Sequence, residues 1–194
     1  MKIKPEILEG KRIILASKSP RRNELLKLIC SSFEVIPANT DETVPDGVEP
    51  DEAAEYTAVG KAKAINEDGI IIACDTIVIV DGEILGKPKD RQSAFEMLRK
   101  LSGKTHMVIS GVALKCGERS LSFSDKTFVS FYNMSDSEIE DYLDSGEPFD
   151  KAGAYGIQGL GGVFVKEIQG DYFNVVGLPV AKLRKMLCSF AAMC

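Results

Sequence analysis

Two adjacent arginines follow a Ser-Pro pair near the N-terminus and could bind an anion. The segment reads Ser17, Lys18, Ser19, Pro20, Arg21, Arg22. Because Ser is a good N-cap and Pro suits the first helical position, the arginines fall in the first turn of a predicted helix. Cations at that end of a helix cost roughly 0.3–1 kcal/mol each unless an anion binds there. The pattern fits a phosphate site, and equally arginines that face solvent or pair with nearby acids.

Asp75 is a carboxylate inside an apolar run that spans residues 70–80. Burying a carboxylate is costly unless it is paired, bound to a metal or placed at the mouth of a site. Asp75 is therefore a candidate general base or metal ligand, and the alternative is a carboxylate hydrogen-bonded at a strand end. Thr76 follows it and would point to the opposite face of a regular strand, so both could reach one ligand only near an irregular end.

Four further polar side chains could take part in the same chemistry, although each could also be an ordinary surface residue. Lys87 lies in a Gly-Lys-Pro corner that would present an ammonium group to a phosphate, and Lys61 lies in an Ala-rich helix. Glu42 could ligate a metal, but seven other acids share residues 31–60. Gln158, in a glycine-rich segment, could read the edge of a base or a sugar.

The scarcity of histidine and the spacing of the cysteines exclude several kinds of site. His106 is the single histidine, which excludes a zinc site with several His ligands, and we expect a structural role for it. The five cysteines are far apart with no CxxC pair, and the N-terminus lacks the apolar stretch of a signal peptide. We therefore expect reduced thiols and a cytoplasmic location. No apolar run approaches the roughly 20 residues that a membrane span needs.

Charge is distributed unevenly along the 194 residues. The totals are 24 Lys and Arg against 29 Asp and Glu, a net charge of −5, which argues against a nucleic acid polymer as partner. Residues 1–30 hold eight basic and three acidic residues, whereas residues 31–60 hold eight acids and no Lys or Arg. These segments are either two solvated faces or parts of a site that combines cations for an anion with carboxylates for a metal.

The elements that must position these side chains alternate between strands and helices. Apolar runs predict strands at residues 12–17, 70–80, 83–85, 105–114, 120–132 and 163–169. Capping patterns predict helices that begin at Ser19, Asp51, Asp90, Ser135 and Pro179, with loops at 37–50 and 153–162. The alternation predicts an α/β protein with a mixed β-sheet and flanking helices, formed by one domain over residues 1–194.

The motifs occur together in an order that resembles the Maf (septum-formation) family of nucleoside triphosphate pyrophosphatases, over nearly the whole chain. The two long and specific blocks are residues 15–26 and 150–159. The shorter blocks are residues 61–64, 75–76, 86–88, 106–112 and 174–179. Cys74 departs from the family pattern, which has Ala, Ser or Gly before the aspartate.

The resemblance implies a mixed-sheet fold with two lobes around a deep cleft, similar to the inosine triphosphate pyrophosphatases. It also implies cleavage of a nucleoside triphosphate between the α- and β-phosphates with the help of Mg²⁺ or Mn²⁺, held by Glu42 or Asp75. Asp75 matches the proton acceptor of the family. The positions that match phosphate or nucleotide contacts are Ser17, Arg21, Arg22, Lys61, Lys87 and Gln158, and among these Arg21, Arg22 and Lys87 would neutralise and align the triphosphate.

Three positions distinguish the subtypes of this family. Members that act on dTTP and UTP have Arg, Thr and Gln where this chain has Arg21, Thr76 and Gln158. Members that act on 7-methyl-GTP have Trp at the first of these positions and Gln at the second. The resemblance therefore implies a dTTP/UTP pyrophosphatase, with Thr76 and Gln158 offering hydrogen bonds to the edge of a pyrimidine.

Two alternatives remain at the level of the sequence. The chain could be a nucleotide-binding regulator of cell division, although its complete set of candidate residues from Arg21 to Gln158 argues for an enzyme. It could also be a pyrophosphatase for another nucleotide, such as inosine or xanthosine triphosphate, or for a modified pyrimidine, because base selection rests on few residues. The sequence leaves open whether the chain forms a homodimer.

Overall fold

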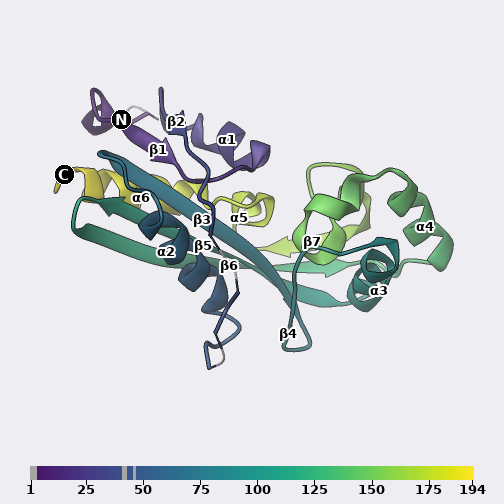
Figure 1. Cartoon of the computed structure of the whole chain (residues 1–194). Coiled ribbons are helices and arrows are strands. Elements are labelled where there is room, and N and C mark those ends of the chain that lie inside the picture. Colours follow the sequence, from purple (N-terminus) through teal and green to yellow (C-terminus); the bar gives the residue numbers. More distant parts are fainter. Residues whose placement is uncertain (1–3, 41–42, 46) are drawn as a thin grey trace. The chain divides into compact units, whose positions relative to one another are not determined.

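A mixed β-sheet forms the centre of the structure, a computed structural model that describes residues 4–40, 43–45 and 47–194 (Figure 1). Within these residues the strand order is β2-β1-β3-β5-β6-β7, and β4 pairs with β3. The strands are β1 Ile13–Leu15, β2 Glu34–Val35, β3 Ile70–Val80, β4 Glu83–Leu85, β5 Thr105–Cys116, β6 Arg119–Phe131 and β7 Val165–Gln169. β1 is parallel to β2 and β3, whereas the β3–β4 and β6–β7 pairs are antiparallel. The predicted mixed sheet is confirmed.

Helices flank the sheet, as the alternating pattern predicts. The α-helices are α1 Pro20–Leu26, α2 Ala53–Lys63, α3 Arg91–Leu101, α4 Asp136–Asp144, α5 Tyr172–Val176 and α6 Val180–Ala191. Short 3₁₀ helices are η1 Glu6–Leu8, η2 Glu147–Asp150, η3 Ala152–Ala154 and η4 Leu160–Phe164. The segment 153–162, predicted as loop, therefore contains 3₁₀ turns, and α5 and β2 were not predicted.

The described chain divides into two compact units. Unit 1 comprises Met1–Asp75, Ser110–Asp125 and Gly177–Cys194, and unit 2 comprises Thr76–Ile109 and Lys126–Val176. The chain passes from one unit to the other within β3, β5 and β6, so each of these three strands supplies residues to both. Asp75 is the last residue of β3 in unit 1, and Thr76 is the first in unit 2.

In unit 1, α2 packs closely on the strands. Small residues of α2, such as Ala58 and Ala62, bury against β1, β3 and β5. The fit is closest at Gly111 of β5, where a Cβ atom would lie 2.2 Å from the backbone nitrogen of Glu55. A side chain at residue 111 would therefore push the helix away from the sheet. The close approach also fixes the height of Lys61, in the last turn of α2, above the strands.

In unit 2, the core contains residues of β3, β5, β6, α3 and α4. It includes four aromatic side chains, those of Phe131, Tyr142, Tyr155 and Phe164. Figure 1 shows α3 and α4 lying next to each other. Both begin at capping boxes, formed by Asp90 with Ser93 and by Ser135 with Glu138. The predicted starts at Asp90 and Ser135 are confirmed, and the part of Ser93 in the first box was not predicted. By contrast, the prediction that Asp51 caps α2 is wrong, because Glu52 is the N-cap and makes no side-chain cap hydrogen bond.

The tight turn between β3 and β4 is also as predicted. Asp81 and Gly82 have φ angles of 52° and 78°, the positive values that a type I′ hairpin turn needs at both central positions. Lys104 donates to the Asp81 carboxylate at 2.6 Å and lowers its pKa. The hairpin therefore delivers the chain to the Gly-Lys-Pro corner at residues 86–88 in a defined direction.

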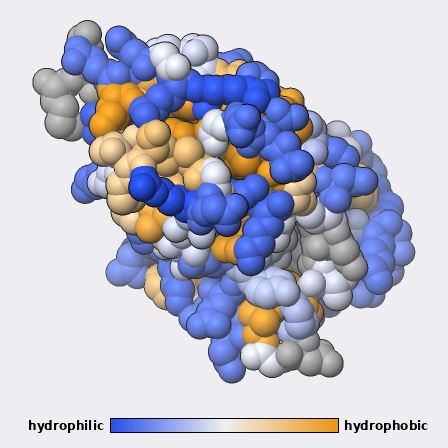
Figure 2. Space-filling view, turned by 60° about the vertical axis from the view of Figure 1, so that its left-hand side comes forward, coloured by the Kyte–Doolittle hydropathy of each residue, from blue (hydrophilic) through white to orange (hydrophobic). Residues whose placement is uncertain are grey.

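Hydrophilic residues cover most of the face shown in Figure 2, between separate hydrophobic areas. Among the residues described, none of the helices is both long and apolar enough to cross a membrane. All five cysteines belong to these residues, and all are free thiols.

Candidate functional site

The Ser-Pro-Arg-Arg segment of unit 1 forms a compact turn that fixes one of its two arginines. The Ser17 hydroxyl oxygen accepts from the Ser19 backbone N–H at 3.2 Å and from Arg22 Nη1 at 3.3 Å. Ser19 is the N-cap of α1 and accepts from the Arg22 N–H, while Pro20 is the first helical residue. The predicted start of this helix is confirmed. Arg21 and Arg22 are both half-buried rather than fully solvated.

A backbone carbonyl far along the chain completes the support of Arg22. The oxygen of Gly177 accepts from Arg22 Nε at 2.9 Å and from the Cys74 thiol at 3.2 Å. Gly177 has a φ angle of 121°, which favours glycine at this position. Because Cys74 precedes Asp75, the Gly177 carbonyl links the Arg22 guanidinium to the part of β3 that carries the candidate base. Nothing in the sequence pointed to this carbonyl, apart from the family block at residues 174–179.

Asp75 is paired with Lys61 inside unit 1. The Lys61 ammonium lies 2.7 Å from Asp75 Oδ1, and the two side chains are only 9% and 16% exposed. A carboxylate this deep requires a cation or hydrogen bonds, and Lys61 supplies both. Its place at the end of α2 is also favourable, since the carbonyl end of a helix attracts positive charge. Lys61 is therefore not the ordinary surface lysine that was one of the two sequence interpretations.

Three more of the predicted residues belong to unit 2. Thr76 is half-buried in β3, and Lys87 is exposed in the corner after β4. Gln158 is exposed in a turn that the Gly159 N–H closes onto the Gly156 oxygen at 3.3 Å. The Gly153 N–H donates to the Gly86 oxygen at 3.0 Å, so the corner that carries Lys87 is attached to the segment that leads to Gln158.

Metal ligands were predicted at Glu42 and Asp75. Glu42 lies outside the described residues. Over residues 4–40, 43–45 and 47–194, no three His, Cys, Asp or Glu residues are grouped closely enough to hold a metal ion. Asp75 therefore offers one carboxylate rather than a protein-built cage. One or two carboxylates with phosphate oxygens of the substrate are the usual ligands of Mg²⁺ in phosphate chemistry, and this donor set fits that pattern.

His106 is a core residue of unit 2. It is 2% exposed, its Nε2 lies 2.9 Å from the Tyr155 hydroxyl, and its ring meets Phe131 edge-on with centroids 4.8 Å apart. Within the described part of the chain its Nδ1 has no hydrogen-bond partner. Burial lowers the pKa of His106 from 6.5 to about 4, so the ring is neutral at pH 7. These contacts agree with the expected structural role.

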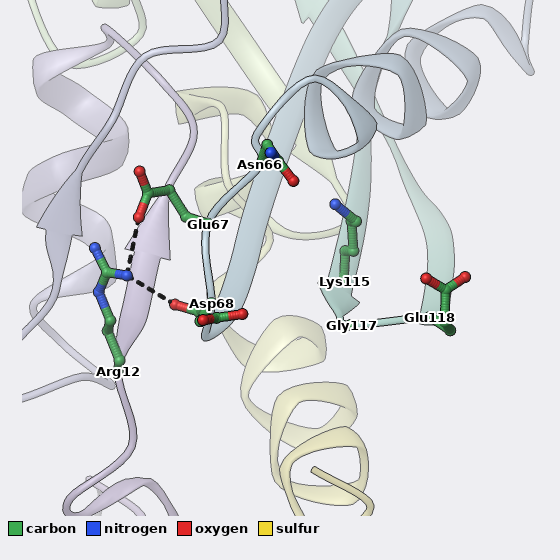
Figure 3. Close-up of a pocket in the computed structure, with 7 residues that line it drawn as sticks. All are labelled: Arg12, Asn66, Glu67, Asp68, Lys115, Gly117 and Glu118. Atoms are coloured by element: carbon green, nitrogen blue, oxygen red, sulfur yellow. Dashed lines mark hydrogen bonds and ion pairs between the residues drawn. The ribbon is translucent and has the colours of Figure 1, made fainter.

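A polar pocket of unit 1 holds none of the predicted site residues (Figure 3). It is lined by Arg12, Asn66, Glu67, Asp68, Lys115, Gly117 and Glu118. Arg12 donates to the Glu67 carboxylate and to the Asp68 carbonyl, both at 3.0 Å, and Figure 3 shows these contacts as dashed lines. At about 3.3 Å per strand residue, Asp68 is roughly 23 Å from Asp75 along the chain. This pocket is therefore separate from the Asp75 cluster.

Comparisons with known proteins agree with the motif pattern. Residues 12–190 match a family described as "Maf-like protein". A relative from Thermosipho africanus, named dTTP/UTP pyrophosphatase, is 53% identical over 91% of this chain and 92% of its own. Relatives with the same name from Carboxydothermus hydrogenoformans and Bacillus velezensis are 52% and 47% identical, over 91% and 93% of this chain and 97% of each of theirs. Among solved structures, the Ham1 protein of Staphylococcus aureus aligns with a TM-score of 0.45 and 20% identity, over 62% of this chain and 72% of that one.

Proposed function

This chain belongs to the Maf family, and we propose that it hydrolyses dTTP and UTP to the nucleoside monophosphate and pyrophosphate. The observation that carries the proposal is the buried pair of Lys61 in α2 and Asp75 in β3. Cys74, which precedes Asp75, and the fixed arginine Arg22 both donate to the Gly177 carbonyl. These contacts place a carboxylate and cations in one unit, as phosphoryl transfer requires. The high identity to relatives named dTTP/UTP pyrophosphatase supports the choice of substrate.

In the proposed mechanism, Asp75 acts as the general base. Lys61 holds Oδ1, and we assign to Oδ2 the proton of a water molecule that attacks the α-phosphorus. The water oxygen forms a bond to phosphorus, the bond from phosphorus to the bridging oxygen breaks, and pyrophosphate leaves with the electron pair. Lys61 orients Asp75, so the base is in place without reorganisation.

We assign the neutralisation of the triphosphate to Arg21, Arg22 and Lys87. The fixed guanidinium of Arg22 supports this role, because a donor held by Ser17 and Gly177 needs little ordering when a phosphate binds. Ser17 acts through Arg22 and through the turn, since its oxygen accepts from both.

We assign selection of the base to Thr76 and Gln158, as the family resemblance implies. Both are polar groups of unit 2 that can donate and accept hydrogen bonds. We also propose that residues 1–194 act as one functional domain. This is supported by β3, β5 and β6, because each of these strands supplies residues to both units and neither unit contains any of the three in full.

A divalent cation, Mg²⁺ or Mn²⁺, would polarise the phosphate oxygens and offset charge on the leaving pyrophosphate. Among the described residues Asp75 would hold it, together with oxygens of the substrate. A cytoplasmic location is part of the proposal, and the five free thiols support a reducing compartment.

The test is a panel of nucleoside triphosphates incubated with the purified chain and Mg²⁺ or Mn²⁺, with release of pyrophosphate and monophosphate as the readout. We expect selective turnover of dTTP and UTP, which ends when EDTA removes the metal. Preference for 7-methyl-GTP or inosine triphosphate would replace the proposed substrate class. Absence of turnover across the whole panel would contradict the enzymatic proposal and favour a nucleotide-binding regulator.

A further inference from the structure

The turn that carries Gln158 is held at both of its ends by side chains of unit 2. After the turn, the backbone N–H of Leu160 donates to Glu147 Oε2 at 2.9 Å, and that of Gly161 donates to Glu147 Oε1 at 3.2 Å. Before the turn, the N–H of Gly156 donates to the hydroxyl of Tyr142 at 3.1 Å. These contacts fix the backbone on both sides of the residue proposed to read the base.

Glu147 and Tyr142 also hold each other. The Tyr142 hydroxyl donates to Glu147 Oε1 at 2.8 Å, and the Tyr142 ring packs edge-on against Phe164, with centroids 5.3 Å apart. Tyr142 belongs to α4, whose N-terminus carries a capping box, and Glu147 begins η2. The pair is therefore built on regular structure rather than on the glycine-rich segment that it holds.

The glycines of this segment leave the space that Glu147 and Tyr142 occupy. A Cβ atom at Gly159 would lie 2.1 Å from Glu147 Oε2, and one at Gly161 would lie 2.6 Å from the Tyr142 hydroxyl. At these two positions a side chain would displace the Glu147 carboxylate or the Tyr142 hydroxyl, so glycine preserves the contacts that hold the turn. This separates the segment from a phosphate-binding glycine loop, in which the backbone N–H groups face the ligand.

The Glu147 carboxylate is anionic at neutral pH. Burial opposes the ionisation of Glu147, but hydrogen bonds from Leu160, Tyr142 and Gly161 outweigh burial and lower its pKa. A carboxylate is suited to this position because both of its oxygens accept, whereas an amide would offer one acceptor and turn an NH₂ group toward a donor.

We propose that Glu147, supported by Tyr142, is a positioning residue that sets the selection of the base by fixing the turn of Gln158. This inference rests on the proposed function, since it assumes that Gln158 contacts the base. Glu147 does not touch the substrate in this assignment. It acts through the backbone of residues 156–161, and its removal lets Gln158 sample orientations that no longer favour the correct base.

The experiment compares wild type with Glu147→Gln, Tyr142→Phe and Gln158→Ala, using UTP and CTP, whose base edges differ at N3 and at the 4-substituent. We expect wild type to prefer UTP, and Glu147→Gln and Tyr142→Phe to lower the ratio of kcat/KM for UTP over CTP by roughly tenfold. Glu167→Gln, at an exposed carboxylate of β7, is the matched control and should leave the ratio unchanged. Tyr142→Phe keeps the ring packing, so it tests the hydroxyl alone.

A double substitution separates positioning from a general loss of structure. If Glu147 acts through Gln158, adding Glu147→Gln to Gln158→Ala produces no further loss of the ratio. If the two substitutions lower the ratio additively, the inference is overturned. It is also overturned if Glu147→Gln leaves the ratio unchanged although hydrogen exchange at Leu160 and Gly161 becomes faster. A wild-type chain that turns over neither UTP nor dTTP would instead overturn the proposed function, and with it the discrimination that Glu147 is said to set.

Discussion

Asp75 meets Lys61 through a single oxygen, so the isosteric amide can keep that contact while it removes the base. We expect Asp75→Asn to lower turnover of UTP by roughly 10²–10⁴-fold, the usual worth of a general base. Binding of the triphosphate should remain, because Arg22 is held by Ser17 and Gly177 and not by Asp75. Release of pyrophosphate measures the first effect, and calorimetry with a non-hydrolysable UTP analogue measures the second.

Asp68→Asn is the matched control for this substitution. Asp68 is an exposed carboxylate in the same unit, at the polar pocket of Figure 3, and its contact with Arg12 is made by its backbone oxygen. Asp68→Asn should keep full activity. Full activity in Asp75→Asn would refute the general-base assignment.

His106 makes the stability of the fold depend on pH. Its pKa falls from 6.5 to about 4 on folding, so between these values the unfolded chain binds a proton that the folded chain does not. Acid therefore favours unfolding, and this residue alone should remove about 2 kcal/mol of unfolding free energy between pH 7 and pH 5. Urea titrations at both pH values measure the loss, which should be absent in His106→Gln. An equal loss in the variant would assign the effect to other groups.

At the scale of residues, the sequence identified candidate site residues whose type alone is unusual at their position. Asp75 could be recognised because a carboxylate interrupts an apolar strand. Its partner Lys61 could not be distinguished from a surface lysine, because the pairing depends on how closely α2 packs on the sheet. The role of the Gly177 carbonyl could not be predicted for a further reason. Every residue has a backbone carbonyl, and no residue type marks the one that accepts from Arg22.

At the scale of elements, the position of α2 depends on a glycine in the sheet. Gly111→Ala would place a methyl group 2.2 Å from the backbone of Glu55, so α2 must move. We expect a loss of unfolding free energy of about 3 kcal/mol, together with reduced activity, because α2 carries Lys61. Thermal unfolding and pyrophosphate release measure the two effects.

Gly60→Ala provides the control within the same helix. Gly60 is exposed in α2, and a Cβ atom there meets nothing within 4 Å. Alanine is the better helix former, so this variant should gain about 0.5–1 kcal/mol of unfolding free energy. If both glycine variants changed the unfolding free energy in the same direction, the close packing on Gly111 would not be what determines the position of α2.

Elements with strong local signals were predicted, and those that depend on distant contacts were not. The β3–β4 hairpin follows from Asp81-Gly82, and α4 follows from its capping box. β2 is two residues long and exists because it pairs with β1, and α5 spans only five residues. Segments this short carry too little periodicity to be separated from loops. The 3₁₀ helix η4 begins at Leu160 and Gly161, whose N–H groups donate to Glu147, and this contact was not visible in the local sequence.

At the scale of the whole molecule, the two units should unfold together, because three strands run through both. The chain lacks tryptophan, and four of its five tyrosines, Tyr132, Tyr142, Tyr155 and Tyr172, lie in unit 2. Near-UV circular dichroism therefore reports mainly on unit 2, and far-UV on both. We expect coincident midpoints in wild type and in Gly111→Ala, although that substitution lies in unit 1. Separate midpoints would contradict a single cooperative transition.

The family and the mixed sheet could be predicted from the order of the motifs and the alternation of elements, and both are confirmed. The deep cleft and the roles of the site residues stay predictions, and the question of a homodimer stays open. Each depends on contacts between distant parts of the molecule or with a ligand, and a linear pattern of residue types carries little information on such contacts.

The threading of the chain has a consequence for how the protein matures in the cell. Unit 1 draws on the first 75 residues, a middle segment and the last 18 residues, Gly177–Cys194. Those last residues supply the carbonyl that holds Arg22 and a helix that buries Leu183, Leu187 and Phe190. During translation Gly177 leaves the ribosome long after Arg22, so the arginine that we assign to the triphosphate receives this support only once residue 177 has emerged. A nascent chain that has not yet reached Gly177 would thus lack the support of Arg22 and would not act on the nucleotide pool.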